Sequence, residues 1–222
     1  MSIQEDLRTI LRTKGARIIF GSRAGAPIHP TDGGLEELGF IKPNRRMAQI
    51  MLWPARSPPE IEIRYAADDD AAANGIVVDW VEQKATYGIL TRLPGFVFTA
   101  RLGACRSYLL RDHRDHPGCI IGAHGHQGTQ GGALLICDPV DYFLSRGSKE
   151  IWEFHSKGLF GKPVANKTTF GATLCYVDAA TAYCFAFAYI ERTHGLQVVE
   201  LVKHGKKDLA EIADWRRASV AE

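Results

Sequence analysis

The sequence lacks an excess of charge of either sign. Of its 222 residues, 27 are Lys or Arg and 25 are Asp or Glu, so the formal net charge at pH 7 is only +2. The basic clusters at 42–46 and 203–207 have no aromatic residues interleaved with them. A protein that binds nucleic acid or an acidic membrane surface usually needs a stronger positive field than this. We therefore expect neither nucleic acid nor a membrane among the partners of this chain.

The sequence also lacks the marks of a disulfide-bonded or membrane-inserted chain. The start, MSIQEDLRTILRTKG, is charged and has no apolar stretch of a signal peptide, and no run reaches membrane-spanning length. The cysteines are odd in number and form no CxxC pair, which favours reduced thiols in a reducing compartment. They are Cys105, Cys119, Cys137, Cys175 and Cys184. We expect a cytoplasmic protein, or one exported into a host cell without a conventional signal peptide.

Short apolar runs are abundant and are typical of β-strands. Hydrophobic residues make up 45% of the chain, and the breaks between the runs carry Gly, Pro or Asp. Alternating or continuous apolar character predicts strands at 16–20, 48–53, 60–65, 75–81, 86–93, 96–101, 106–111, 119–124, 132–137, 168–178, 181–191 and 196–204. The chain is long enough to bury a sizeable core without a metal or a disulfide.

Helices are expected at the two ends of the chain. Ser2 and Glu5 have the spacing of a capping box before an apolar face that stops at Gly15. The segment 206–222 has apolar residues at helical spacing, and 139–158 has broken helical character. No repeat or linker divides the chain, so we expect one sheet-dominated α+β domain over residues 1–222.

Cys105 stands out among the cysteines because it follows a turn between two predicted strands. In the stretch LGAC, the small residues Gly103 and Ala104 allow a sharp bend that presents the thiol beside backbone N–H groups. Such groups stabilise the oxyanion that forms when a thiolate attacks a carbonyl. The alternative is packing, since free cysteine is among the most buried residue types.

A thiol nucleophile also needs a base, and the next hairpin supplies a candidate. The strands at 106–111 and 119–124 would return the chain antiparallel and bring His124 near Cys105 in a solvent-reachable notch. Thr99, on the strand that leads into the turn, would then hydrogen-bond the imidazole and fix its tautomer.

These residues resemble a known catalytic core. The pattern TARLGAC…LLRD…GAH, over residues 96–126, is similar to the bacterial glutamine deamidases of the CheD and cytotoxic-necrotizing-factor superfamily, which includes a small lethal-factor toxin. Members have a Thr, a Cys six residues later in a tight turn, and a His at the end of the next strand. Thr99, Cys105 and His124 match. The nineteen residues from Cys105 to His124 exceed the family interval, and LGAC replaces the serine-containing forms of the turn.

The resemblance implies a β-sandwich-like core with helices packed on it, and a Cys-His amidohydrolase. Cys105 would attack the side-chain amide of a glutamine on a partner protein, and His124 would protonate the departing ammonia. Gly103 and Ala104 would form the oxyanion turn. No cofactor is implied, and the chain would act as a toxin or effector. Transglutamination and proteolysis use the same chemistry and stay open, as do the target and the oligomeric state.

A metal site is the competing interpretation of the same histidines. GCIIGAHGH, residues 118–126, fits the start of a cupin pattern, in which His124 and His126 would bind zinc or iron. The next cupin ligand should be a glutamate, but Gln130 stands at that position. The glycine-rich stretch 125–132 lacks the lysine of a phosphate-binding loop and is expected to be a mobile loop. A third interpretation is an interaction module whose thiols only pack.

Overall fold

The computed structural model describes most of the chain, and its core consists of β-strands. The described residues are 2–21, 41–43, 45–67, 69–79, 81, 84–103, 105–130, 133–156, 163–164, 167–193 and 195–212. The Gly/Pro-rich passage at 21–34, which the sequence predicts as a loop, lies outside them except for Gly21, as do Ala104 and the segment 213–222. Among the helices of the described part, none is long and apolar enough to span a lipid bilayer.

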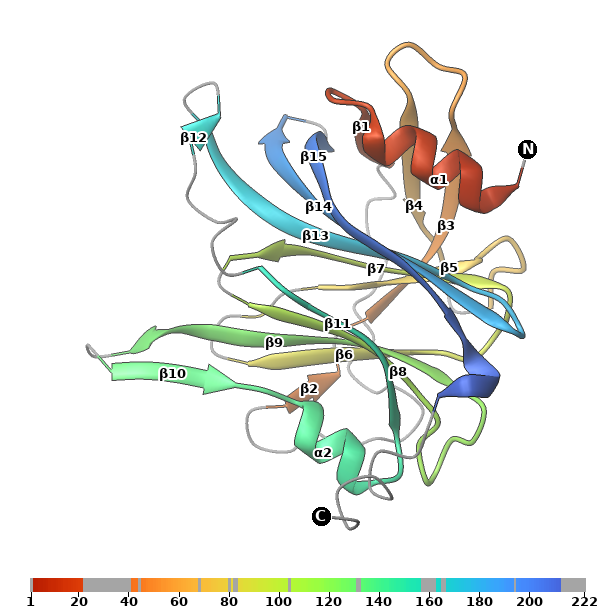
Figure 1. Cartoon of the computed structure of the whole chain (residues 1–222), viewed down its shortest axis with the longest axis vertical. Coiled ribbons are helices and arrows are strands. Elements are labelled where there is room, and N and C mark those ends of the chain that lie inside the picture. Colours follow the sequence, from red (N-terminus) through yellow and green to blue (C-terminus); the bar gives the residue numbers. More distant parts are fainter. Residues whose placement is uncertain are drawn as a thin grey trace.

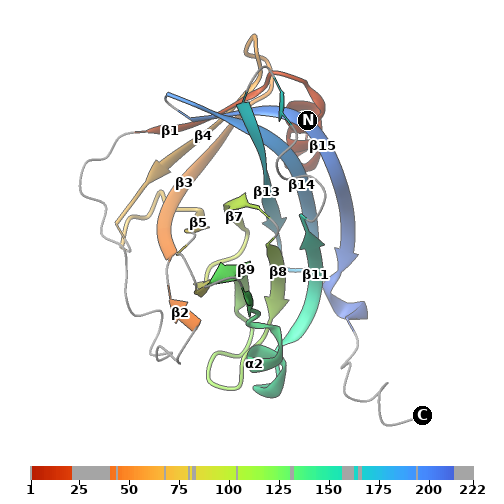
Figure 2. The same cartoon turned by 90° about the vertical axis from the view of Figure 1, so that its left-hand side faces the viewer.

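The larger of two sheets closes on itself. Its order is β12-β13-β14-β15-β1-β4-β3-β5-β7, and a further pairing of β7 with β13 joins the ends into a cylinder, with β12 outside the closed ring. In Figure 2 these strands curve around a common axis. The strands are β1 (Arg17–Gly21), β3 (Arg45–Trp53), β4 (Glu60–Tyr65), β5 (Gly75–Val78), β7 (Gly95–Leu102), β12 (Pro163–Val164), β13 (Lys167–Val177), β14 (Thr181–Arg192) and β15 (Gly195–Asp208).

The second sheet packs against the outer wall of the cylinder. Its order is β11-β8-β9-β6-β2, and β10 pairs with β9. Figure 1 shows this sheet below the cylinder, with α2 (Val140–Ser145) on its far face. The strands are β2 (Ile41–Pro43), β6 (Ala85–Leu90), β8 (Arg106–Arg111), β9 (Ile120–Gln130), β10 (Ala133–Cys137) and β11 (Lys149–His155).

Three apolar clusters fill the spaces between these layers. One lies inside the cylinder and includes the buried face of α1 (Ile3–Arg12), a helix that begins with the expected capping box of Ser2 and Glu5. A second lies between the cylinder and the second sheet, and the third lies between that sheet and α2. Side chains alternate between the two faces of a strand, and the central strands β6, β8 and β9 therefore contribute to both of the last two clusters. The interface between the cylinder and the sheet is therefore lined mainly by buried apolar side chains.

The sheet-rich α+β character is confirmed, but the expected sandwich needs correction. A sandwich has two open layers, whereas here one layer is a closed ring. The strand pattern alone does not reveal closure, because alternation states which face is buried and not which strands pair. The ring forms because β7 pairs with β5 on one side and with β13 on the other.

Three local expectations were also wrong. In the described part of the predicted helix at 206–222, β15 continues to Asp208 by pairing with β14, and Leu209–Glu211 form a short 3-10 helix. In 139–158 the helix ends at Ser145, and Lys149–His155 form a strand paired with β8. The stretch 125–130 is no loop but part of β9, paired with β10. In each case cross-strand hydrogen bonding overrides the local pattern.

Candidate catalytic site

Cys105 lies directly before β8, after the turn that ends β7. Its side chain is only 3% exposed and belongs to the cluster between the cylinder and the second sheet, so the expected solvent-reachable notch is closed in this structure. The turn is fastened by Ser156, which follows β11. The Ser156 hydroxyl donates to the carbonyls of Gly103 and Cys105, and its backbone N–H donates to Cys105 O at 3.1 Å. Ser156 thus holds the thiol-bearing turn against the second sheet.

His124 lies in β9, on the strand next to the one that Cys105 begins. The expected antiparallel pairing of β8 with β9 is present, with Ser107 opposite His124 and Arg106 opposite Gly125. On its other side His124 is opposite Thr86 of β6. Because alternate residues share a face, Cys105, Ser107, His124 and Thr86 all face the cylinder. The hairpin therefore brings the thiol and imidazole positions onto one face of two neighbouring strands.

The cylinder adds hydroxyl groups to this face. Thr173 of β13 lies opposite Thr99 of β7, and the Ser107 and Thr173 hydroxyl oxygens are 2.9 Å apart across the two layers. Thr99 is buried, but its hydroxyl donates to Val78 O at 3.0 Å and not to the imidazole as expected. We call the set Thr86, Thr99, Cys105, Ser107, His124 and Thr173 the interlayer polar cluster.

The imidazole of His124 has no hydrogen-bond partner in the part of the chain that the structure describes. Its side chain is 1% exposed, and both ring nitrogens are without a partner, as is the Thr86 hydroxyl. Burial, followed by the charge of nearby His126, lowers the pKa of His124 to about 3. The ring is therefore neutral at pH 7. Buried polar groups are almost always paired, so an unpaired buried imidazole makes His124 a candidate functional residue.

The structure gives less support to the expected oxyanion turn and to the expected metal site. Gly103 lies in the turn and its carbonyl accepts from Ser156, whereas Ala104 lies outside the described residues. His126 lies two residues beyond His124 in β9, on the same face by alternation, and is partly exposed. Among the described residues no three His, Cys, Asp or Glu side chains come together as a metal site. His124 and His126 thus have no third ligand in that part of the chain.

Sequence reasoning found three members of the cluster and missed three. Ser107, Thr86 and Thr173 were not expected, nor was the fastening role of Ser156. Ser107 has a usable signal, since it lies two residues after Cys105 on a predicted strand and must share its face. Thr86 and Thr173 come from strands whose pairing no local pattern specifies.

Comparison of the chain with protein-family models, with curated proteins and with solved structures finds no match.

Proposed function

We propose that the chain is a Cys-His amidohydrolase that deamidates a glutamine side chain on a partner protein. Cys105 is the nucleophile and His124 is the acid-base group. The observation that carries the proposal is the imidazole of His124, which lies beside the strand that Cys105 begins and has neither ring nitrogen committed to another described group. An uncommitted imidazole on the strand beside a cysteine nucleophile is what proton exchange between the two groups requires.

The reaction balances with these two residues and water. His124 takes the thiol proton, and the thiolate attacks the amide carbon to form a tetrahedral oxyanion. The C–N bond then breaks, and ammonia leaves with the proton from the imidazolium, which leaves a thioester on Cys105. Water adds to the thioester with His124 as base, the C–S bond breaks, and the products are glutamate and the free thiol. The partner protein gains one negative charge.

The closed interface must open for this chemistry. Thiol and imidazole are both covered by the cylinder wall, and burial opposes a charged imidazole. Separation of the Ser156-fastened turn from β11 would admit the glutamine side chain and rehydrate His124. Its pKa would then rise toward the ordinary value for histidine, at which it accepts a thiol proton near pH 7.

An active-site label tests the proposal without knowledge of the target protein. The glutamine analogue 6-diazo-5-oxo-L-norleucine alkylates thiols that attack glutamine-like carbonyl groups. We expect one adduct, located at Cys105 by mass spectrometry, which the Cys105→Ser variant no longer forms and which His124→Gln forms much more slowly. Cys119→Ser is the matched control, because Cys119 is similarly buried, lies directly before β9 as Cys105 lies before β8, and belongs to the cluster on the α2 side of the sheet.

A second measurement follows the reaction itself. Ammonia release from benzyloxycarbonyl-Gln-Gly should depend on Cys105 and be unaffected by Cys119→Ser. Absence of both the label and the ammonia would refute the proposal. Stoichiometric zinc or iron in the purified protein, lost in His126→Ala, would replace it with the metal-binding interpretation of His124 and His126.

A further inference from the structure

A cavity at one end of the cylinder is separate from the interlayer polar cluster. It has a volume of about 560 Å³ and lies where β7 and β14 end and β15 begins. Phe98 and Ala100 line it from the inner face of β7, whereas Thr99 between them faces the opposite way, toward the second sheet. The wall formed by β5 and β7 therefore divides the cavity from Cys105 and His124. Cavities of this size, at the open end of a ring of strands, are typical of small-molecule sites.

Aromatic rings form much of the cavity wall. Phe20 stacks on Tyr65 with ring centroids 6.3 Å apart, and it packs at a tilt against Phe98 at 6.0 Å. Tyr189 lines the wall as well, and its hydroxyl accepts a hydrogen bond of 2.8 Å from the Arg101 N–H. Such rings offer flat apolar faces on which a planar ligand can stack.

Arg101 holds this part of the wall in an unusual backbone conformation. Its φ is 58°, in the left-handed region that non-glycine residues seldom adopt. Arg101 lines the cavity and lies within the stretch between Thr99 and Leu102 where the register of β7 with β13 shifts. Strained backbone of this kind concentrates at ligand sites.

Among the described residues that line the cavity, one cation has no carboxylate partner. Arg46 pairs with Asp79 at 2.6 Å, and Arg101 pairs with Glu191 at 3.1 Å. Arg192 also lines the cavity, and among the described residues its guanidinium donates to the neutral side-chain oxygen of Gln197, at 2.7 Å from Nε, and to no carboxylate. The charges of the lining side chains thus sum to one net positive charge, which lies on the rim.

From this arrangement we infer that the end of the cylinder binds a small planar aromatic carboxylate. The aromatic body stacks among Phe20, Tyr65 and Phe98, and the carboxylate receives hydrogen bonds from Arg192 at the rim. A guanidinium recognises a carboxylate through two parallel N–H donors, so a neutral ligand of the same shape binds less tightly. Nothing in the site depends on the chemistry of Cys105.

Calorimetric titration of the full chain with 2-naphthoate and with its neutral isostere 2-naphthamide tests the inference. We expect saturable one-to-one binding of 2-naphthoate, about five- to tenfold tighter than binding of 2-naphthamide, because a charge-assisted contact is lost with the amide. Arg192→Gln should bring the affinity for 2-naphthoate down to that for 2-naphthamide. Arg114→Gln, which removes an exposed arginine remote from the cavity, should change neither affinity.

Filling the cavity provides the steric test. Ala100→Trp should abolish binding of both compounds, and Val81→Trp does the same from another position on the wall if the first variant fails to fold. Unchanged binding in a folded tryptophan variant, equal affinity for the two compounds, or no binding to the wild type would overturn the inference. Cys105→Ser should bind 2-naphthoate normally, which separates this site from the proposed deamidase activity.

Discussion

His124 is a buried imidazole whose surroundings leave both ring nitrogens unpaired in the described part of the chain. An unpaired buried polar group destabilises a folded protein by about 1–3 kcal/mol. We predict that His124→Leu raises the free energy of unfolding at pH 7 by roughly 1 kcal/mol, because it removes this cost and fills part of the same volume. Chemical denaturation at pH 7 measures the change. A variant less stable than wild type would contradict the view that His124 is retained for function.

The same substitution should alter the pH dependence of stability. The pKa of His124 is about 3 in the folded protein, below its value of 6.5 in the unfolded chain. Between these values the unfolded chain binds a proton that the folded protein does not, so the free energy of unfolding falls by up to ~1.4 kcal/mol per pH unit as the pH drops. We expect His124→Leu to lose less stability than wild type between pH 6.5 and pH 4. Burial also lowers the pKa of His113, so only the difference between the two proteins isolates His124.

Ser156 offers a residue-scale test of how the thiol is kept closed. Its hydroxyl accounts for two hydrogen bonds to the Gly103–Cys105 turn, whereas its backbone N–H remains in any variant. We predict that Ser156→Ala destabilises the protein by about 1–2 kcal/mol and speeds alkylation of Cys105 by iodoacetamide at least several-fold. Peptide mapping gives the rate at each cysteine. An equal acceleration at Cys137, which lies on the other face of the second sheet, would indicate general loosening and contradict a local role.

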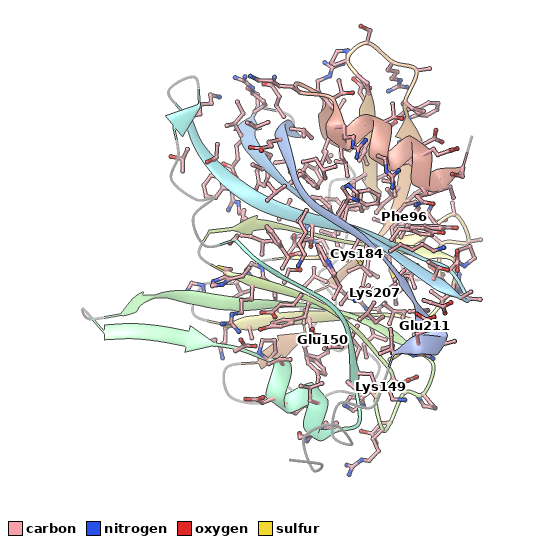
Figure 3. The ribbon with its side chains drawn as sticks, viewed as in Figure 1. Phe96, Lys149, Glu150, Cys184, Lys207 and Glu211 are labelled. Atoms are coloured by element: carbon pink, nitrogen blue, oxygen red, sulfur yellow. The ribbon has the colours of Figure 1, made fainter. Side chains whose placement is uncertain are left out.

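At the scale of elements, strands with a clear alternating period and short breaks are predicted correctly from the sequence. The prediction fails where cross-strand pairing competes with a helical pattern. The strands at 60–65 and 106–111 have the predicted bounds, because turn residues delimit both. In Figure 3, Lys149 and Glu150 begin β11, Lys207 lies near the end of β15, and Glu211 lies in the short 3-10 helix that follows. From the sequence, the first segment has broken helical character and the second is predicted as helix. Both segments have apolar residues at helical spacing, but as strands they form cross-strand hydrogen bonds, β11 with β8 and β15 with β14.

Gly195 is the glycine at which an added side chain would disrupt strand pairing most directly. Its φ is 152°, and an added Cβ would lie 2.0 Å from Ile18 O on the paired strand β1. We predict that Gly195→Ala separates the start of β15 from β1 and lowers the free energy of unfolding by more than ~3 kcal/mol, in the range of severe steric substitutions. Hydrogen exchange at β1 should accelerate together with the loss of stability.

Gly118 provides the matched control for that substitution. It also has a positive φ, of 79°, but an added Cβ would have no neighbour within 4 Å. Gly118→Ala should therefore show only the backbone cost of the left-handed region, about 1–2 kcal/mol. Equal losses in the two variants would mean that the contact with Ile18 does not decide the pairing of β1 with β15.

At the scale of the whole molecule, the candidate site depends on an arrangement that no local pattern contains. Cys105 and His124 come from one hairpin, so sequence reasoning could place them on neighbouring strands. Thr173 and Thr99 reach the site only because β13 and β7 pair and close the ring, and because the second sheet packs on that part of the wall. Contacts between segments so distant in the chain follow from global packing, which propensity and periodicity do not encode.

The close approach of the two layers rests on small residues that face each other. Gly88 and Gly122 are opposite on β6 and β9, and an added Cβ on Gly122 would lie 2.4 Å from Val97 Cγ1 on the cylinder wall. We predict that Gly122→Ala pushes the layers apart and destabilises the whole fold by about 1–3 kcal/mol, as overpacking does in other cores. Val97→Ala removes the atom that collides. The destabilisation of the double variant should therefore be smaller than the sum of the two single destabilisations by at least ~0.5 kcal/mol. Urea unfolding of the four proteins gives this coupling energy. Strictly additive effects would mean that the position of the second sheet on the cylinder does not depend on this contact. The interlayer polar cluster would then lack the fixed geometry that proton exchange between Cys105 and His124 requires.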